Sequence, residues 1–364
     1  MIFKNLGNSA VKISAIGMGL GGNFGKNSDL QSIDLIKTAV DNGTNFFDTA
    51  EVYLDGHSEE ILGKAIKKIR DRVIIASKFS PNHSRKKGVI KALDGSLRRL
   101  KSDYIDLYQV HWPNLKVPLE ETISTLEGQL KKGKIRFIGV SNFSLKRIKE
   151  SLKRLNGPHL TSVQNEYNFS ERGAEKDILP FCNKNNITFI AYNPLGPGLP
   201  LKNRKKSQLL SKLAKQYGKN QTQIVLNWLI SKPNVVAIPS TTSKAHLREN
   251  VECGTFSLER KDSTSIDKTF EQKVRLIPVS KIKISDDGKT CLTLEDALNN
   301  IYSSVPSPLE LAQEIKAGDF LKPIKLKKIA SKSNQKYLLS GGKIRFWAWV
   351  IAFGDRKPVP SVID

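Results

Sequence analysis

The sequence has few cysteines, no apolar run long enough to span a bilayer, and fewer acidic than basic residues. Its three cysteines (Cys182, Cys253 and Cys291) are widely spaced and odd in number, which is typical neither of a disulfide framework nor of a zinc site. The N-terminus lacks the basic, apolar and small-residue succession of an export signal. These absences predict a cytoplasmic protein without a membrane segment.

The formal net charge of +24 at pH 7 is the strongest bias in the composition. The excess of Lys and Arg is spread in proportion to length rather than gathered in one arm. A nucleic-acid surface is more often a local basic patch with interleaved aromatic residues. We therefore interpret the charge as a basic surface that attracts anionic ligands, which leaves nucleic acid as a disfavoured partner.

Apolar runs and amphipathic helices alternate from the N-terminus to about residue 257. The apolar runs are Ile13–Ile16, Asn45–Phe47, Val73–Ala76, Ile105–Val110, Ile135–Val140, Ser162–Val163, Ile187–Ala191 and Val235–Ile238. The helical patterns are Leu30–Asp41, Ser58–Ile69, Lys86–Leu100, Leu119–Lys131, Leu145–Arg154, Lys205–Tyr217 and Thr222–Ile230. Eight such units predict an α/β fold, a (β/α)8 TIM barrel. An open doubly wound sheet that binds a dinucleotide would be expected to carry a Gly-x-Gly-x-x-Gly turn at the start of a helix, and no such turn occurs in the sequence.

The pattern changes after the barrel. Residues 258–270 are polar and weakly patterned, which predicts a linker. From residue 271 to residue 364, short extended segments surround two helical patterns, Leu309–Lys316 and Ile344–Ala352. The extended segments are Val274–Val279, Ile282–Ile284, Pro323–Ile329, Tyr337–Leu339 and Pro358–Ile363. This pattern predicts a second, small α+β domain.

Polar residues follow most of the predicted barrel strands. They are Asp48, Lys78, His111, Ser141, Asn142, Gln164, Tyr192 and Ser240, in strand order from the second strand to the eighth. Because the reacting groups of TIM barrels come from the C-terminal ends of several strands, these residues predict a single polar mouth. Tyr53 follows Asp48 by five residues and belongs to the same mouth.

This set of side chains suits hydride transfer to a carbonyl. The carbonyl oxygen gains negative charge and needs a proton, and a tyrosine can supply it if an ammonium lowers its pKa. Tyr53 and Lys78 fill these roles, Asp48 holds the lysine charged, and His111 orients the oxygen. Each residue alone is more often structural, and only the combination favours catalysis. The sequence has no ligand cluster of zinc spacing and no Gly-x-Ser-x-Gly motif, so no metal is expected.

Several motifs resemble the aldo-keto reductase family. They are Asn45–Ala65, Asp103–Pro113, Lys134–Phe143, Gln164–Tyr167, Ala191–Leu195 and Ile238–Asn250. The resemblance covers about residues 3–254 and implies a TIM barrel over residues 1–257 that binds NADP(H), or sometimes NAD(H). It implies reduction of an aldehyde, ketone or sugar-like carbonyl to an alcohol. By position, Asp48, Tyr53, Lys78 and His111 match the catalytic tetrad, with Tyr53 as proton donor.

The resemblance also implies the cofactor contacts. Ser141, Asn142 and Gln164 match residues that hold the nicotinamide carboxamide, and Tyr192 matches the residue that stacks on its ring. Further matched positions are Asn193, Leu195, Ser240, Thr241, Lys244, Arg248, Glu249 and Asn250. Members that favour NADPH often carry Lys and Arg where this chain has Ser240 and His246, which leaves NAD(H) open. The segment after Tyr192 is short and the usual C-terminal substrate loop is absent, so substrate contacts are not implied.

Residues 271–364 resemble the ParB/sulfiredoxin-like fold. The motifs are Ile277–Ile282, Leu311–Lys316, Lys322–Ile324 and Ser340–Arg345. The resemblance implies phosphate or nucleotide binding by Gly342, Lys343 and Arg345. Lys343 stands where the sulfiredoxin cysteine would fall, so that redox chemistry is excluded. A packing role, or a contribution to the pocket around Tyr53, stays open.

For the whole chain, the alternative is an NADP(H)-sensing regulator, or a protein that binds nucleotide or nucleic acid, with little turnover. The complete tetrad favours the enzyme.

Overall fold

The computed structural model describes residues 1–156, 160–196, 198–199, 203–286, 291–319, 322–330 and 334–363. The chain forms two compact units, Met1–Phe270 and Glu271–Asp364, which are described separately. Among the described residues, no helix is both long and apolar enough to cross a membrane.

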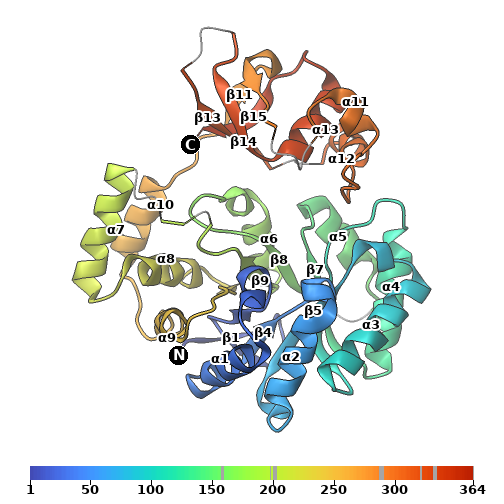
Figure 1. The fold of residues 1–364 in the computed structure, drawn as a ribbon, viewed down its shortest axis with the longest axis vertical. Helices are drawn as coiled ribbons and strands as arrows, with labels where there is room; N and C mark the ends of the chain where they lie inside the picture. Colours follow the sequence, from blue (N-terminus) through green and yellow to red (C-terminus); the bar gives the residue numbers. More distant parts are fainter. Residues whose placement is uncertain are drawn as a thin grey trace. The chain divides into compact units, whose positions relative to one another are not determined.

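The first unit is built around eight parallel strands in the sheet order β10-β9-β8-β7-β6-β5-β4-β3 (Figure 1). They are β3 (Met18–Gly19), β4 (Phe46–Asp48), β5 (Ile74–Phe79), β6 (Ile105–Val110), β7 (Ile135–Ser141), β8 (Leu160–Glu166), β9 (Thr188–Tyr192) and β10 (Val235–Ala237). A parallel bridge connects Ile16, two residues before β3, to Ala237 of β10, the other outermost strand. The predicted TIM barrel is therefore confirmed.

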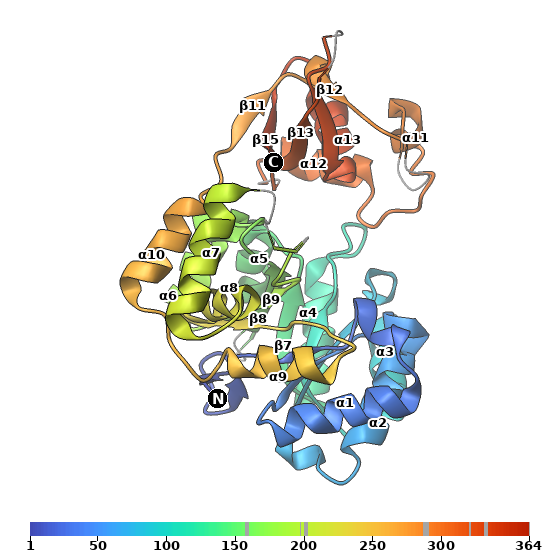
Figure 2. The same ribbon diagram turned by 60° about the vertical axis from the view of Figure 1, so that its left-hand side comes forward.

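Helices surround the strands (Figures 1 and 2). They are α1 (Asp29–Asp41), α2 (His57–Ile66), α3 (Lys86–Leu100), α4 (Leu119–Lys131), α5 (Leu145–Arg154), α6 (Ile178–Lys184), α7 (Arg204–Tyr217), α8 (Gln221–Ile230), α9 (Lys244–Glu252) and α10 (Arg260–Thr269). Capping boxes at Ser28 and Asn220 fix the starts of α1 and α8, since each side chain satisfies an unpaired backbone N–H. In α3, the buried Val89, Leu93 and Leu100 repeat at helical spacing and face the core.

The predicted first strand, Ile13–Ile16, is wrong in part, because its first half pairs outside the barrel whereas Ile16 bridges to Ala237 of β10. Part of that run forms β2 (Lys12–Ser14), which pairs antiparallel with β1 (Phe3–Asn5), and the first barrel strand is β3. The hairpin supplies Leu6 and Ile13 to the apolar cluster inside the barrel. An apolar run before a glycine-rich turn fits either position, so hydrophobic pattern alone did not separate them.

The predicted linker at residues 258–270 is also wrong. Helix α10 occupies most of it, and its Ile266 and the following Phe270 are buried in the barrel core. The carboxylate of Asp267 accepts hydrogen bonds from Trp228 Nε1 at 2.9 Å and Lys232 Nζ at 2.7 Å. A polar helix of this kind is held by tertiary contacts rather than by a broad apolar stripe, which explains its weak pattern.

The second unit is an α+β fold around the mixed sheet β11-β15-β13-β14-β12. Its strands are β11 (Arg275–Ile277), β12 (Ile282–Lys283), β13 (Ile324–Lys328), β14 (Tyr337–Gly341) and β15 (Val359–Ile363). Its helices are α11 (Leu294–Leu298), α12 (Pro308–Lys316) and α13 (Lys343–Phe353). Phe346 and Trp347 of α13 pack on Leu326 and Leu339 of the sheet. The two predicted helices are present, and α11 was not predicted.

Candidate active site

The ammonium of Lys78 is the centre of the polar mouth. It donates to Asp48 Oδ1 at 2.6 Å, to the carbonyl oxygen of Thr49 at 2.8 Å and to Tyr53 Oη at 3.3 Å. Neighbouring parallel strands bring the groups together, since Asp48 ends β4 and Lys78 lies near the end of β5. Lys78 and Asp48 are almost fully buried.

The electrostatics of this cluster favour a charged lysine. Burial alone lowers the pKa of the Lys78 ammonium, but the carboxylate of Asp48 and the oxygen of Tyr53 outweigh it, and the pKa is raised above its ordinary value. Asp48 Oδ2 accepts a further hydrogen bond from Gln164 Nε2 at 2.7 Å. A buried ion pair persists only when its remaining lone pairs are satisfied in this way.

His111 completes the predicted tetrad as a neutral imidazole. Burial, and then the charge of Lys78, lower its pKa to about 2. Its ring lies 5.7 Å from the Tyr53 ring at 80° and stacks on Trp112 at 3.6 Å. His111 Nδ1 has no hydrogen-bond partner among the described residues. A neutral ring can donate a hydrogen bond to a carbonyl oxygen without carrying charge into the site.

Backbone geometry presents the hydroxyl of Tyr53. Tyr53 opens the short turn η2 (Tyr53–Gly56), in which Leu54 and Asp55 both have a φ of 53° and Gly56 has a φ of 90°. Left-handed geometry at a non-glycine residue costs about 1–2 kcal/mol. Gly21 lies so near that a Cβ there would be 2.9 Å from the Tyr53 ring. The fold thus holds a strained turn behind the tyrosine and leaves room for its ring.

The predicted carboxamide residues gather at the ends of β7, β8 and β9. Asn142 Nδ2 donates to the carbonyl oxygen of His111 at 3.0 Å and to Ser141 Oγ at 3.1 Å, and Tyr192 Oη donates to Asn142 Oδ1 at 2.8 Å. The amide of Asn142 is thus engaged within the protein, and Gln164 Nε2 is engaged by the tetrad.

The predicted adenosine-phosphate residues lie around the start of α9. Ser240 Oγ donates to the carbonyl oxygen of Gly21 at 3.0 Å, and Thr241 Oγ1 accepts from Ser243 N at 3.1 Å. Lys244 pairs with Asp34 of α1. The remaining predicted positions differ in exposure: Arg248 and Asn193 are exposed, Leu195 and Glu249 are half-buried, and Asn250 is buried.

In the second unit, Gly342 has a φ of 82° and joins β14 to α13. Arg345 Nη1 donates to the carbonyl oxygens of Lys322 at 3.1 Å and Pro323 at 3.2 Å. Lys343 Nζ lies 3.4 Å from the carbonyl oxygen of Ser285. The predicted phosphate cations therefore make contacts with backbone oxygens within the unit.

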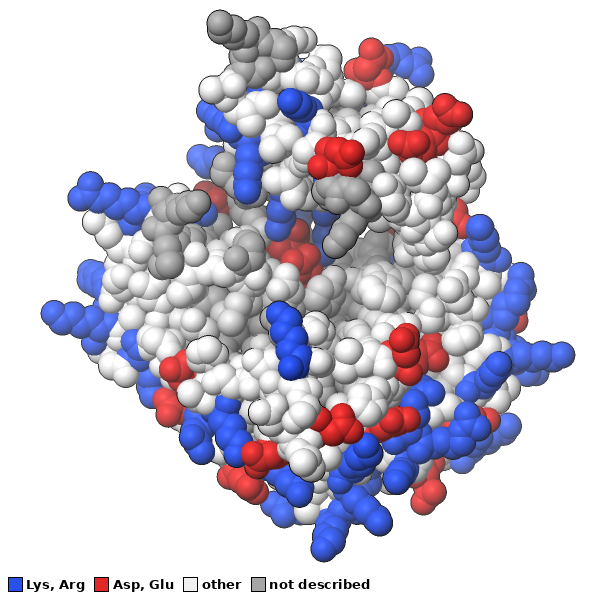
Figure 3. Space-filling view, in the orientation of Figure 1, with Lys and Arg blue, Asp and Glu red and all other residues white. Residues whose placement is uncertain are grey.

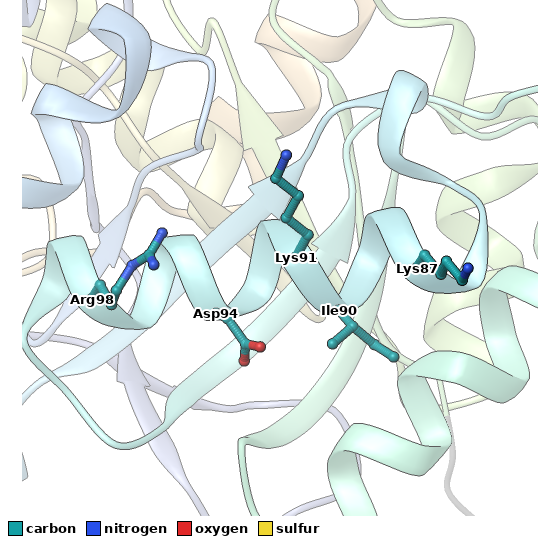
Figure 4. A pocket seen from close by; sticks show the side chains of 5 residues that line it. All are labelled: Lys87, Ile90, Lys91, Asp94 and Arg98. Atoms are coloured by element: carbon teal, nitrogen blue, oxygen red, sulfur yellow. The ribbon is translucent and has the colours of Figure 1, made fainter.

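On the face drawn in Figure 3, Lys and Arg side chains are spread over the surface rather than gathered in one patch. A depression of about 430 Å³ on α3 is lined by Lys87, Ile90, Lys91, Asp94 and Arg98, which project from successive turns (Figure 4). None of the predicted site residues lines it. The tetrad, by contrast, brings buried and mutually bonded polar groups together at the C-terminal ends of neighbouring barrel strands.

Residues 15–271 match the model of the Aldo/keto reductase family. The chain belongs to this family. It is 33% identical to the aldo-keto reductase YhdN of Bacillus subtilis, over 75% of this chain and 95% of that protein. It is 32% identical to the methylglyoxal reductase YeaE of Escherichia coli, over 65% and 83% respectively. The predicted family resemblance is confirmed for the barrel.

Solved aldo-keto reductase structures share the barrel. The thermostable aldo-keto reductase Tm1743 aligns with a TM-score of 0.69 at 38% identity, over 74% of this chain and 99% of that one. An aldo-keto reductase from Klebsiella pneumoniae in complex with NADPH aligns with a TM-score of 0.68 at 33% identity, over 74% and 96%.

Two contacts of the tetrad were missed at the level of sequence. Gln109 Nε2 lies 3.5 Å from Asp48 Oδ2, and Trp112 stacks on His111. Gln109 precedes His111 by two residues in a strand, and strand periodicity places the two on the same face. That alternation was a usable signal for Gln109, whereas the stacking of Trp112 depends on the turn after β6.

Proposed function

We propose that this aldo-keto reductase is an NADP(H)-dependent oxidoreductase that reduces an aldehyde, ketone or sugar-like carbonyl to an alcohol. The observation that carries the proposal is the hydrogen-bonded group of Asp48, Lys78 and Tyr53 beside a neutral His111. Relatives that are named as reductases, and related structures that hold NADPH or NADP, support the same reaction and cofactor.

The chain's own residues supply the proton chemistry. NADPH, when bound, supplies the hydride that adds to the carbonyl carbon. Tyr53 Oη donates a proton to the carbonyl oxygen, and the ammonium of Lys78 stabilises the phenolate that remains. Asp48 keeps Lys78 charged and oriented, and His111 donates a hydrogen bond to the carbonyl oxygen. Ser141 and Gln164 would hold the carboxamide so that one face of the nicotinamide meets the substrate.

Replacing Tyr53 tests the reaction. Tyr53→Phe removes the proton donor and should lower kcat/KM for NADPH-dependent reduction of an aldehyde panel at least about 100-fold. Calorimetry should show unchanged NADPH binding. Tyr302→Phe, at an exposed tyrosine of the second unit, is the matched control. Tight NADPH binding by the wild type without turnover of any carbonyl would instead favour a cofactor-sensing protein.

For the second unit we propose that Gly342, Lys343 and Arg345 bind the phosphates of a nucleotide, as in ParB-like folds. The support is a left-handed glycine that opens a helix with two cations in its first turn. Calorimetry of the full chain with ATP, CTP and short duplex DNA tests this. Binding should be lost in Gly342→Ala, whose Cβ would lie 2.9 Å from Arg345 Nη2. No heat with any of the three would leave a packing role.

A further inference from the structure

A second polar pair, Glu51 and His83, stands beside the tetrad on the same two loops. Glu51 lies between Asp48 and Tyr53 in the chain, and its backbone N–H donates to the carbonyl oxygen of Lys78 at 3.1 Å. Its carboxylate Oε1 accepts from Ser80 N at 2.5 Å and bonds His83 Nδ1 at 2.8 Å. The pair thus links the loop that carries Tyr53 to the loop that follows Lys78.

The two side chains differ in exposure. The carboxylate of Glu51 is 10% exposed, whereas the imidazole of His83 is 42% exposed. Because a carboxylate can only accept a hydrogen bond, the proton of a neutral His83 ring lies on Nδ1, which faces Glu51. Nε2 then keeps its lone pair. No partner for Nε2 occurs among the described residues.

The backbone turn that carries the His83 ring is also held in place by hydrogen bonds. His83 ends the turn η4 (Pro81–His83), which Ser80 caps by accepting from Asn82 N. Asn114 Nδ2, in the loop after the strand of His111, donates to the carbonyl oxygen of Pro81 at 2.8 Å. The turn therefore contacts the loops that carry the tetrad on both sides, as a preorganised recognition group should.

We propose that His83, oriented by Glu51, is a specificity residue that accepts a hydrogen bond from a hydroxyl group of the carbonyl substrate. The preferred substrates are then short hydroxyaldehydes and hydroxyketones rather than their unsubstituted counterparts. In its neutral form the ring suits a hydroxyl, since Nε2 is then an acceptor, and the adjacent carboxylate disfavours a substrate anion. This inference rests on the proposed function, because it needs a carbonyl reductase.

The test compares two aldehydes of equal chain length, glyceraldehyde and propanal, by kcat/KM referred to the unhydrated form. His83→Asn keeps a donor near the position of Nδ1 for Glu51 and removes Nε2. It should lower kcat/KM for glyceraldehyde by roughly tenfold, mainly through KM, and leave propanal unchanged. His83→Gln, whose amide reaches the position of Nε2, should restore part of the preference.

The other outcomes contradict either the assignment of His83 or the proposed function. An equal loss on both aldehydes, or no change on either, would overturn the assignment of His83 while the reductase activity stands. A wild type that turns over neither aldehyde overturns the proposed function, and this inference with it.

Discussion

The two units of this chain differ in the charged side chains that they bury and in the apolar side chains that they leave exposed. The barrel buries charged side chains and pairs them with partners of opposite charge. Lys78 donates a hydrogen bond to Asp48, and Arg99 Nε donates one to Glu59 at 2.7 Å. The second unit exposes many large apolar side chains: Val274, Leu276, Leu292, Leu294, Leu298, Ile301, Tyr302, Val305, Leu309 and Ile344. A short domain buries a smaller share of its surface than a long one. The large barrel core can therefore support a costly buried ion pair and a strained turn.

Removing one cation from each unit gives the largest expected contrast. Lys78→Met should lower kcat/KM for carbonyl reduction by about 10²–10⁴-fold, because the phenolate of Tyr53 loses its stabilising charge. Arg345→Met should leave this value unchanged, since Arg345 lies in the unit without the tetrad. Steady-state kinetics with NADPH measures both variants. Equal losses would show that the chemistry depends on both units.

Truncating one core phenylalanine in each unit tests whether the units unfold separately. Phe47→Ala and Phe346→Ala each remove a buried ring, 0% and 3% exposed, and should each cost about 3–5 kcal/mol. Phe346→Ala should lower one calorimetric transition and spare carbonyl reduction, whereas Phe47→Ala should lower the other. NADPH should raise only the transition that Phe47→Ala lowers. A single transition that responds to both substitutions would contradict independent units.

The sequence predicted the barrel well because each of its layers leaves a local signal. Parallel strands buried on both faces appear as apolar runs, and the polar residue after each run marks the strand end. This rule locates Asp48, Lys78 and His111 from the sequence alone. It failed in part for Ile13–Ile16, whose end bridges to the distant Ala237. It failed for α10, whose Asp267 is held by the distant Trp228 and Lys232.

The hydrogen-bond and ion-pair partners of individual side chains were not predictable from the sequence. The family resemblance implies that Asn142 holds a carboxamide, but it does not indicate the hydrogen bonds that its amide makes with Tyr192 and with the carbonyl oxygen of His111. Likewise Lys244 was expected near a phosphate and pairs with Asp34. Hydrogen bonds between residues far apart in the chain follow from the closed fold, and sequence spacing does not encode them.

The smallest contrast concerns pH, because all five histidines lie in the barrel unit. Folding lowers the pKa of His111 to about 2, so between pH 2 and 6.5 the unfolded chain binds the extra proton. The barrel should therefore be stable above pH 6.5 and lose about 1.4 kcal/mol by pH 5.5 through this group. In His111→Asn, the transition temperature of the barrel should depend less on pH in that range, as measured by calorimetry.

His57 supplies the control, because it acts in the opposite direction. Hydrogen bonds from its ring to Glu60 and Asp29 raise its pKa, so its contribution is complete below pH 6.5 and is lost as the pH rises above that value. His57→Gln should therefore lower the barrel transition below pH 6.5 and converge with the wild type as the pH rises, and the effect should be small, since the ring is exposed. The transition of the second unit should follow neither substitution. A slope between pH 5.5 and 6.5 that survives in His111→Asn would show that this imidazole can take up a proton in the folded barrel, contrary to a neutral hydrogen-bond donor beside Tyr53.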